Sequence, residues 1–397
     1  MKKREQAAAH RSRILFAGSI DDDNPRLLKL YHAYASAGYD VHFVGMDRLS
    51  NKPRTCQVDG LTCEYLTRGW GYSNWKLLIG YPIWCAKLLL YCLRADCDLF
   101  HSFELDSGGP AAIAGYLRKI PHIYDVQDNY DLRHDWPFPL KPLIRWFDSW
   151  VIRHAAGVIV PDENRLVGPF TAAAEKAAIM PNCPPDVPPP SAPAERKAKM
   201  TVLAMGHLSR GRGVHLLLDA VNGLPDVRLL MAGRFSEPDL EARAKAMGQV
   251  EFRGWIDWQE AIALGYQADV VFAFYDPSSK VNLLANAQKW FDAMMTATPI
   301  LSNREIGNAA WIEEGDFGYL CPFGDVPALR TLLQHIVAHP EEAKAKGRRG
   351  RALFEQKYNW ALMEKKLLHL AGVRAGVQPD QARQTGECVP AARGGSL

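Results

Sequence analysis

The stretch TVLAMGHLSRGRGVHLLLDAV, from Thr201 to Val221, decides how this chain is expected to fold. It begins with a short apolar run and ends with apolar residues at helical spacing, which predicts a strand followed by a helix. The loop GHLSRGRG, Gly206 to Gly213, stands between them. Glycines let a backbone approach an anion closely, and the N-terminus of a helix attracts negative charge. We therefore predict a phosphate-binding loop with Arg210 and Arg212 as its basic side chains.

The same loop argues against an ATPase of the Walker A class. Arg212 stands where that motif has its lysine, and Gly213 stands where it has the hydroxyl residue that holds magnesium. An ordinary strand-to-helix turn remains the alternative for a single glycine-rich loop. The prediction that this loop binds phosphate therefore needs support from other parts of the chain.

Short apolar strands alternate with helical patterns on both sides of this unit, which is typical of parallel α/β sheets. A proline-rich segment, Pro181 to Lys199, interrupts the alternation and reads as a linker, because proline fixes φ and lacks a donor. We predict an α/β fold with two Rossmann-like, doubly wound domains at residues 12–190 and 198–355. Residues 356–371 are predicted to form a C-terminal helix that packs back on the first domain, and residues 372–397 a disordered tail.

A second group of polar residues lies in NLLANAQKWFDAMMTATPIL, from Asn282 to Leu301. On a helix Lys289 and Asp292 are neighbours at i, i+3, and Asn286 lies about one turn earlier. The alternative is a surface Lys/Asp pair on an amphipathic helix. We take this opening turn as part of the ligand site, with the candidates Asn286, Gln288, Lys289 and Asp292.

At these residues the chain resembles the retaining glycosyltransferases of family 4 and, more loosely, the glucuronosyltransferase of xanthan assembly, both with the GT-B fold. The resemblance implies two domains that face each other across a cleft, the second of which binds a UDP- or GDP-sugar. It assigns the donor diphosphate to Gly206 and the pair Arg212-Gly213, although His207 replaces the usual arginine. It also places Gly233, at the end of MAG, and Gly254, at the end of a Val-x-Phe-x-Gly segment, beside the nucleotide.

The chain departs from family 4 at the first of two acids that the family carries about seven residues apart. Asp292 matches the second acid, but Leu284 occupies the place of the first. Contacts to the sugar hydroxyls and the retaining outcome are therefore both open. We keep retaining and inverting transfer as alternatives.

In the first domain, the loop DVQDNYDLRHDW follows a predicted strand at residues 120–124. Ligands of open α/β sheets bind beyond the carboxyl ends of strands, so acceptor chemistry is expected in this loop. An inverting enzyme needs a general base there, and we predict Asp128, with Asp125 as a second candidate. Asp131, His134 and Asp135 are further acids and bases of the same loop.

The other loop of this edge is GSIDDDNPR, Gly18 to Arg26, where the resemblance implies that Gly18 meets donor phosphate. Its three consecutive aspartates do not predict a metal site, because adjacent carboxylates rarely converge on one ion. Enzymes of the GT-B type resemble metal-independent catalysts. We predict no metal and no cofactor apart from the nucleotide sugar.

Composition limits the remaining possibilities. The chain has 397 residues, 48% of them hydrophobic, and a net charge of +3, which does not indicate nucleic-acid binding. Eight cysteines without a CxxC pair read as reduced thiols of a cytoplasmic protein. They stand at positions 56, 63, 85, 92, 97, 183, 321 and 388.

Residues 72–94 are the most membrane-like part of the chain. Aromatic residues, Trp75 and Trp84 among them, interleave there with Lys76, Lys87 and Arg94 in an apolar background. We predict an interfacial helix that brings the protein to the inner face of the plasma membrane as a peripheral protein. A buried helix of the first domain is the alternative.

These features together predict a glycosyltransferase that moves a sugar from a nucleotide-diphosphate sugar to a saccharide acceptor, lipid-linked, in polysaccharide or glycoconjugate synthesis. A catalytically degenerate subunit of a polysaccharide assembly complex is one alternative, because of Leu284, and a sugar-nucleotide epimerase of the same fold is another. An NAD-dependent dehydrogenase does not fit, because GSIDDDNPR contains no GxGxxG. The sequence does not define the sugar, the base, the linkage or the oligomeric state.

Overall fold

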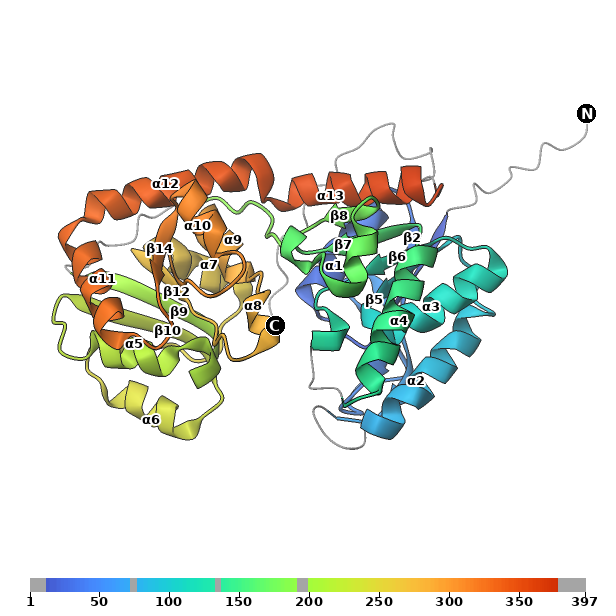
Figure 1. The fold of residues 1–397 in the computed structure, drawn as a ribbon, viewed down its shortest axis with the longest axis horizontal. Coiled ribbons are helices and arrows are strands. Elements are labelled where there is room, and N and C mark those ends of the chain that lie inside the picture. The colour runs from blue at the N-terminus through green and yellow to red at the C-terminus, as the bar shows by residue number, and fades with distance from the viewer. Residues whose placement is uncertain (1–11, 72–76, 133–136, 191–198, 378–397) are drawn as a thin grey trace, which may run out of the picture.

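Two sheets with flanking helices form the part of the chain that the computed structural model describes, residues 12–71, 77–132, 137–190 and 199–377 (Figure 1). The first sheet has eight strands in the order β3-β4-β2-β1-β5-β6-β7-β8 and is parallel except for the β3–β4 pair. Its central strands are buried on both faces, as expected when helices cover a parallel sheet. The strands are β1 (Arg13–Gly18), β2 (Asp40–Asp47), β3 (Thr55–Val58), β4 (Leu61–Arg68), β5 (Leu99–Phe103), β6 (His122–Asp125), β7 (Gly157–Val160) and β8 (Ala177–Ile179).

The second sheet has six parallel strands in the order β11-β10-β9-β12-β13-β14. Counted from its own first strand this is the order 3-2-1-4-5-6 of a dinucleotide-binding Rossmann fold, in which ligands bind where the order reverses. Here the reversal lies between β9 and β12, and in the first sheet it lies between β1 and β5. The strands are β9 (Met200–Leu208), β10 (Val227–Phe235), β11 (Val250–Phe252), β12 (Val270–Ala273), β13 (Ile300–Asn303) and β14 (Gly318–Cys321).

Helices follow most strands and supply the apolar faces that cover the sheets. In the first domain they are α1 (Pro25–Ser36), α2 (Leu77–Cys92), α3 (Glu104–Arg118) and α4 (Leu140–His154). In the second domain they are α5 (Val214–Val221), α6 (Pro238–Ala246), α7 (Trp258–Gln267), α8 (Lys280–Leu283), α9 (Gln288–Met295), α10 (Ala309–Gly315), α11 (Val326–Ala338) and α12 (Pro340–Lys357).

The C-terminal helix α13 (Trp360–His369) returns to the first domain (Figure 1). The C-terminal helix predicted from residue 356 begins instead at Trp360, because α12 ends at Lys357 and the Asn359 side chain caps α13 by accepting from the Leu362 N–H at 3.1 Å. Helix α13 lies against α1, and Lys366 Nζ donates to the carbonyl of Ile179 at 3.0 Å. After the proline-rich linker, the chain thus passes between the domains a second time at residues 358–359. Residues 378–397 of the predicted tail lie outside the described part.

The strands predicted on both sides of the linker are present, and the β3–β4 hairpin, β8 and β14 are additional to them. Strand β4 alternates buried and half-buried residues, a pattern that sequence analysis could have recognised. Strand β8 has only three residues, all half-buried at the sheet edge, so its sequence carries little signal. None of these additions changes the two-domain arrangement.

Candidate functional site

Three glycines remove side chains from the carboxyl ends of β9, β10 and β11. Gly206 and Gly233 are register partners, and a Cβ on Gly233 would stand 1.8 Å from the Gly206 carbonyl oxygen. The N–H of Gly233 donates to the carbonyl of Gly254 at 2.7 Å. All three glycines have positive φ, a backbone conformation that residues with a side chain rarely adopt. We call this bare edge, Gly206, Gly233 and Gly254, the glycine shelf, and it leaves room for a ligand to approach the backbone.

Arg212 lies at the order reversal of the second sheet. It belongs to the 3₁₀ turn Arg210–Arg212 after β9, and Gly213, at φ 66°, leads from this turn into α5. A side chain at position 213 would collide with Phe274, since its Cβ would lie 2.8 Å from that of Phe274. The Arg212 guanidinium stacks over the Tyr275 ring at 4.1 Å and donates to Asn282 Oδ1 at 3.4 Å. Its charge is therefore held on the side of β12.

Lys289, the second residue of α9, adds a second cation at the same place. A Cβ on Gly206 would lie 3.4 Å from Lys289 Cε and 3.8 Å from Nζ, so the ammonium lies against the glycine shelf. Burial, reinforced by the charge of Arg212, lowers the pKa of Lys289 to about 8. Within the described residues no hydrogen bond or ion pair engages this ammonium. Two cations beside bare backbone make an anion site suited to a diphosphate.

Asp292 lies one turn after Lys289 and is buried. Burial raises the pKa of Asp292 to about 7, although Trp258, Lys29 and Lys289 act in the opposite direction. Its Oδ1 has no hydrogen-bond partner among the described residues. This carboxyl group is therefore near its titration point at neutral pH and lies beside the Lys289 charge.

Other predicted donor-site residues of the second domain face different partners. Arg210 forms an exposed ion pair with Asp239 at 2.5 Å, away from the Arg212–Lys289 pair. Asn286 Nδ2 donates to Asp162 of the first domain, and Gln288 Oε1 accepts from Asn182 at 3.0 Å. The Asn286 and Gln288 contacts connect the two domains, whereas the Arg210 pair lies within the second domain. None of the three contacts favours the ligand roles predicted for Arg210, Asn286 and Gln288.

Asp125, at the end of β6, is sealed in the core of the first domain. Arg26 binds both carboxylate oxygens, at 2.9 and 3.0 Å, and His101 lies 3.6 Å away. The Arg26 charge and the hydrogen bonds hold the pKa of Asp125 below its usual value against the effect of burial. A fully buried, doubly bound carboxylate is not placed to take a proton from an acceptor, so the geometry disfavours the role predicted for Asp125.

Among the described residues of the predicted acceptor loop, Asp128 is the accessible acid. Its side chain is 34% exposed, and Oδ1 accepts from Arg165 at 2.8 Å, which leaves Oδ2 for another donor. The N–H groups of Gln127 and Asp128 both donate to Glu104 Oε1 at 3.2 Å. Glu104 holds φ at 60°, an unusual backbone for a non-glycine residue and a form of strain found at functional sites.

Of the other three candidates in this loop, the structure describes only Asp131. Asp131 is buried and bound by Arg145 at 2.8 Å, so it serves the packing of α4. His134 and Asp135 lie outside the described residues. Asp128 therefore stays the best-placed candidate for a base.

The loop after Gly18 is organised by its own polar contacts. Asn24 caps α1 by accepting from the N–H of Arg26 at 2.9 Å, and Ser19 Oγ donates to the buried Asp106. Asp22 is bound by the Lys52 ammonium and the Tyr65 hydroxyl. Asp22 is buried, whereas Asp21 and Asp23 are exposed.

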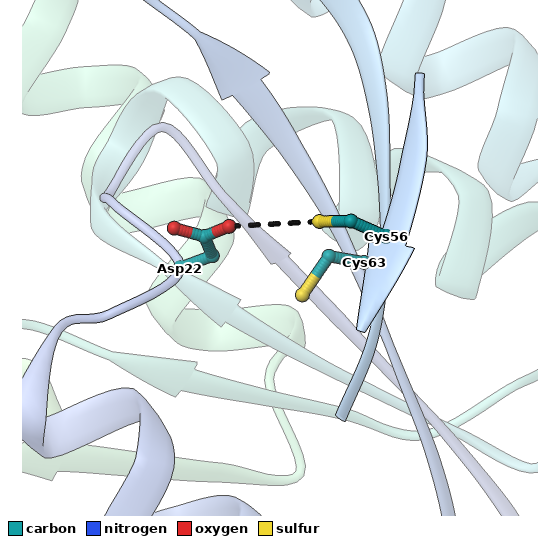
Figure 2. A group of neighbouring side chains, drawn as sticks. All are labelled: Asp22, Cys56 and Cys63. Carbon is teal, nitrogen blue, oxygen red and sulfur yellow. Dashed lines mark hydrogen bonds between the residues drawn. The ribbon is translucent and has the colours of Figure 1, made fainter. Parts of the chain in front are cut away.

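Asp22 does lie near two thiols, Cys56 and Cys63, with ligand atoms within 4.8 Å of one another (Figure 2). Cys56 Sγ lies 3.8 Å from Asp22 Oδ2, a hydrogen-bonding distance for a thiol. Lys52 already neutralises Asp22. Three ligands are also one fewer than a structural zinc site uses. The group does not fit a metal site.

Asp162 and Arg165 are the site residues that sequence analysis missed. They follow β7, and Arg165 lies between Asp128 at 2.8 Å and Asp162 at 3.9 Å. Their position just beyond the carboxyl end of the buried strand β7 was the available signal. Their partners come from distant segments, which a single sequence does not reveal.

Two family models match the chain, one in each domain. The Glycosyl transferase 4-like domain matches residues 24–183, and Glycosyl transferases group 1 matches residues 199–339. The lipopolysaccharide core biosynthesis glycosyltransferase LpsE of Rhizobium meliloti is 28% identical over 141 residues, 34% of this chain. That alignment spans only 39% of the length of LpsE.

Solved structures match over nearly the whole chain. Sucrose-phosphate synthase from Thermosynechococcus elongatus has a TM-score of 0.69 and 20% identity, covering 90% of this chain and 97% of that one. HepE from Anabaena, in complex with UDP, has a TM-score of 0.65 and 16% identity, covering 89% and 98%. At these identities the likeness concerns the fold, and it confirms the predicted pair of Rossmann-like domains.

Proposed function

Because the chain belongs to the GT-B glycosyltransferases, with a 4-like first domain and a group 1 second domain, we propose that it transfers a sugar from a nucleotide-diphosphate sugar to a saccharide acceptor. The observation that carries this proposal is the pair of cations, Arg212 and Lys289, beside the glycine shelf. The pair lies at the order reversal of the second sheet, where Rossmann-like domains bind nucleotides.

In this proposal the donor is a UDP- or GDP-sugar whose diphosphate lies between Lys289 and Arg212. Binding of UDP by HepE, which shares the fold, supports this class of ligand. Bare backbone at Gly206 and Gly233 lets the diphosphate approach the ends of β9 and β10. The cations neutralise the charge that develops on the leaving nucleotide, so no metal or other cofactor is needed.

The acceptor lies on the side of the first domain, where Asp128 serves as general base if the enzyme inverts. Arg165 and Glu104 fix the position of this carboxylate, which is what a base requires. If the enzyme retains configuration, no such base is needed, and the catalytic role falls to Asp292 and the polar groups near the donor. The anomeric configuration of the product, read by NMR, decides between these two routes.

We further propose a lipid-linked acceptor in polysaccharide or glycoconjugate synthesis, and a peripheral position on the inner face of the plasma membrane. None of the helices among the described residues has the length and hydropathy needed to cross a bilayer. The membrane surface predicted at residues 72–94 is modified by the structure: Trp84 is in the core, and Trp75 and Lys76 lie outside the described residues. The apolar side chains of α2 that are exposed, and could contact a membrane, are instead Ile79, Ile83 and Leu90.

A thermal-shift panel of UDP-, GDP-, ADP- and TDP-sugars tests the donor proposal, since a ligand that binds only the folded state raises the unfolding temperature. We expect UDP- or GDP-sugars to raise it, and no response to any of the four would contradict the proposal. A non-catalytic subunit is the second candidate, because Leu284 occupies the place of an acid. Donor binding without any hydrolysis or transfer would favour that candidate.

A further inference from the structure

A groove crosses the surface of the first domain between α2, α3 and α4, which lie side by side in Figure 1. It encloses about 390 Å³, and apolar side chains form nearly all of its wall, among them Ala86 and Leu89 of α2, Ile113 of α3 and Phe147 of α4. A dry apolar cavity of about 150 Å³ is enough to hold benzene. This groove therefore has room for a hydrocarbon chain of several carbons.

Exposed apolar side chains continue from the groove along both flanking helices. Leu140 and Leu143 of α4 are 44% and 57% exposed, and Ile79 and Ile83 of α2 are 52% and 37% exposed. Leu143 precedes Phe147 by four residues and so lies one turn away on the same face of α4. Exposed apolar residues gathered in this way mark a surface that meets another apolar body.

One end of the groove is polar and reaches the loop after β1. Arg48 Nη2 donates to the hydroxyl of Tyr81, a groove residue, at 3.0 Å, and its guanidinium lies over the Tyr81 ring at 5.6 Å. The same nitrogen donates to the carbonyl of Ser19 at 3.0 Å. Ser19 follows Gly18 and donates to Asp106, which also lines the groove. A permanent positive charge thus stands where the apolar wall meets the acceptor-side edge of the first sheet.

We propose that this groove binds the hydrocarbon chain of a lipid-linked acceptor whose anionic phosphate lies at Arg48, so that the attached saccharide extends past Ser19. The proposal rests on the proposed function and names the chemical class of its acceptor. A free saccharide would need hydrogen-bonding groups along its length, and the groove wall offers almost none. An amphiphile with an apolar chain and an anionic phosphate matches the apolar wall and the Arg48 guanidinium.

Dodecyl phosphate, below its micellar concentration, is the probe. We expect the wild-type chain to bind it in isothermal titration at least tenfold more tightly than dodecyl maltoside, which has the same chain without the charge. Inorganic phosphate, which has the charge without the chain, should show no measurable binding in the same range. Equal binding of dodecyl phosphate and inorganic phosphate would assign the site to a free anion and overturn the proposal.

Ala86→Trp fills the groove from an exposed position, so it should not disturb the core. We expect it to weaken dodecyl phosphate binding at least tenfold, while Ala246→Trp, the same change at an exposed position of the second domain, should have no effect. Arg48→Gln should remove the preference for dodecyl phosphate over dodecyl maltoside. Unchanged binding in Ala86→Trp contradicts the proposal.

Two further readouts separate this inference from its alternatives. UDP and GDP binding, measured on the same samples, reports on the proposed function alone: donor binding without amphiphile binding refutes the groove and leaves the function standing. Sedimentation of the wild type and Ala86→Trp tests whether a second copy of the chain occupies the groove. A dimer that Ala86→Trp converts to a monomer would overturn the lipid proposal.

Discussion

Asn286 of the second domain donates from Nδ2 to Oδ2 of Asp162 in the first domain at 3.0 Å. The same nitrogen donates to the Pro161 carbonyl at 3.0 Å, and Asn308 Nδ2 lies 3.5 Å from Asp162 Oδ2. Arg165 then connects Asp162 to Asp128. We call this chain of contacts, from Asn286 through Asp162 and Arg165 to Asp128, the interdomain bracket. It joins the start of α9, which carries Lys289, to the loop that carries the candidate base.

We expect Asn286→Ala to destabilise the chain, because Asp162 is fully buried and would lose its nearest side-chain donor. Asp162 keeps the Asn164 N–H and Asn308 as donors, so the loss is that of a single hydrogen bond, about 0.5–1.5 kcal/mol. The midpoint of urea unfolding measures the loss. Asn222→Ala, an exposed asparagine, is the control and should stay within about 0.5 kcal/mol of wild type. Identical unfolding curves for the two variants would refute the interdomain bracket.

Gly233→Ala should damage the glycine shelf, since the new Cβ would stand 1.8 Å from the Gly206 carbonyl oxygen at a φ of 137°. Either β9 or β10 must move, so we expect loss of nucleotide binding together with a lower unfolding temperature. Gly248→Ala is the matched control, because its Cβ meets nothing within 4 Å. Wild-type UDP or GDP affinity in Gly233→Ala would show that the shelf is not part of the donor site.

Nucleotide affinity should depend on pH through Lys289. Burial lowers the pKa of Lys289 to about 8, so the ammonium is charged below that pH and neutral above it. A bound diphosphate interacts with the charged form, and affinity for UDP or GDP should therefore fall as pH rises above 8, approaching about tenfold per pH unit.

Lys289→Arg is the control for this pH dependence, because a guanidinium keeps its charge throughout the range. We expect its affinity to stay nearly constant between pH 8 and pH 9.5, above the pKa of about 7 of Asp292, as measured by titration calorimetry. The same decline in Lys289→Arg and in wild type would assign the dependence to another group.

Asp128→Asn should lower turnover by about a hundredfold or more if the enzyme inverts, because it removes a general base while leaving an oxygen to accept from Arg165. Nucleotide affinity should stay near the wild-type value, since the change lies on the acceptor side. Asp23→Asn, at an exposed position of the first loop, should keep wild-type turnover. Full activity in Asp128→Asn would exclude Asp128 as the base.

The two domains could be predicted from the sequence because each βα unit shows an apolar run for its strand and helical spacing for its helix. The elements around Gly206 and Lys289 could be predicted for the same reason, since both lie at strand-to-helix turns of the second domain. Their convergence required the strand order β9-β12-β13, which only the structure shows. The donor-site assignment of Arg212 and Lys289 is compatible with that geometry and stays a prediction.

The roles of individual polar residues could not be predicted in the same way. Asn286 and Asp162 are 124 residues apart in sequence, and Arg26 and Asp125 are 99 apart, so their pairing leaves no local pattern. Trp84 shows the same limit for an apolar stretch: α2 is apolar on several faces, and sequence spacing does not say which one enters the core. Sequence reasoning therefore locates the ends of strands more readily than the partners of individual side chains.

Titration of UDP and GDP into the wild type, Arg212→Ala and Lys289→Ala measures whether these two cations hold the donor diphosphate. We expect one of the two nucleotides to bind the wild type and each substitution to weaken its affinity about tenfold or more, because each removes a cation from the diphosphate site. Arg243→Ala, which removes an exposed arginine paired with Asp219, should bind like the wild type. No binding of either nucleotide to the wild type, or unchanged affinity in both Arg212→Ala and Lys289→Ala, would show that the donor does not bind at this pair of cations.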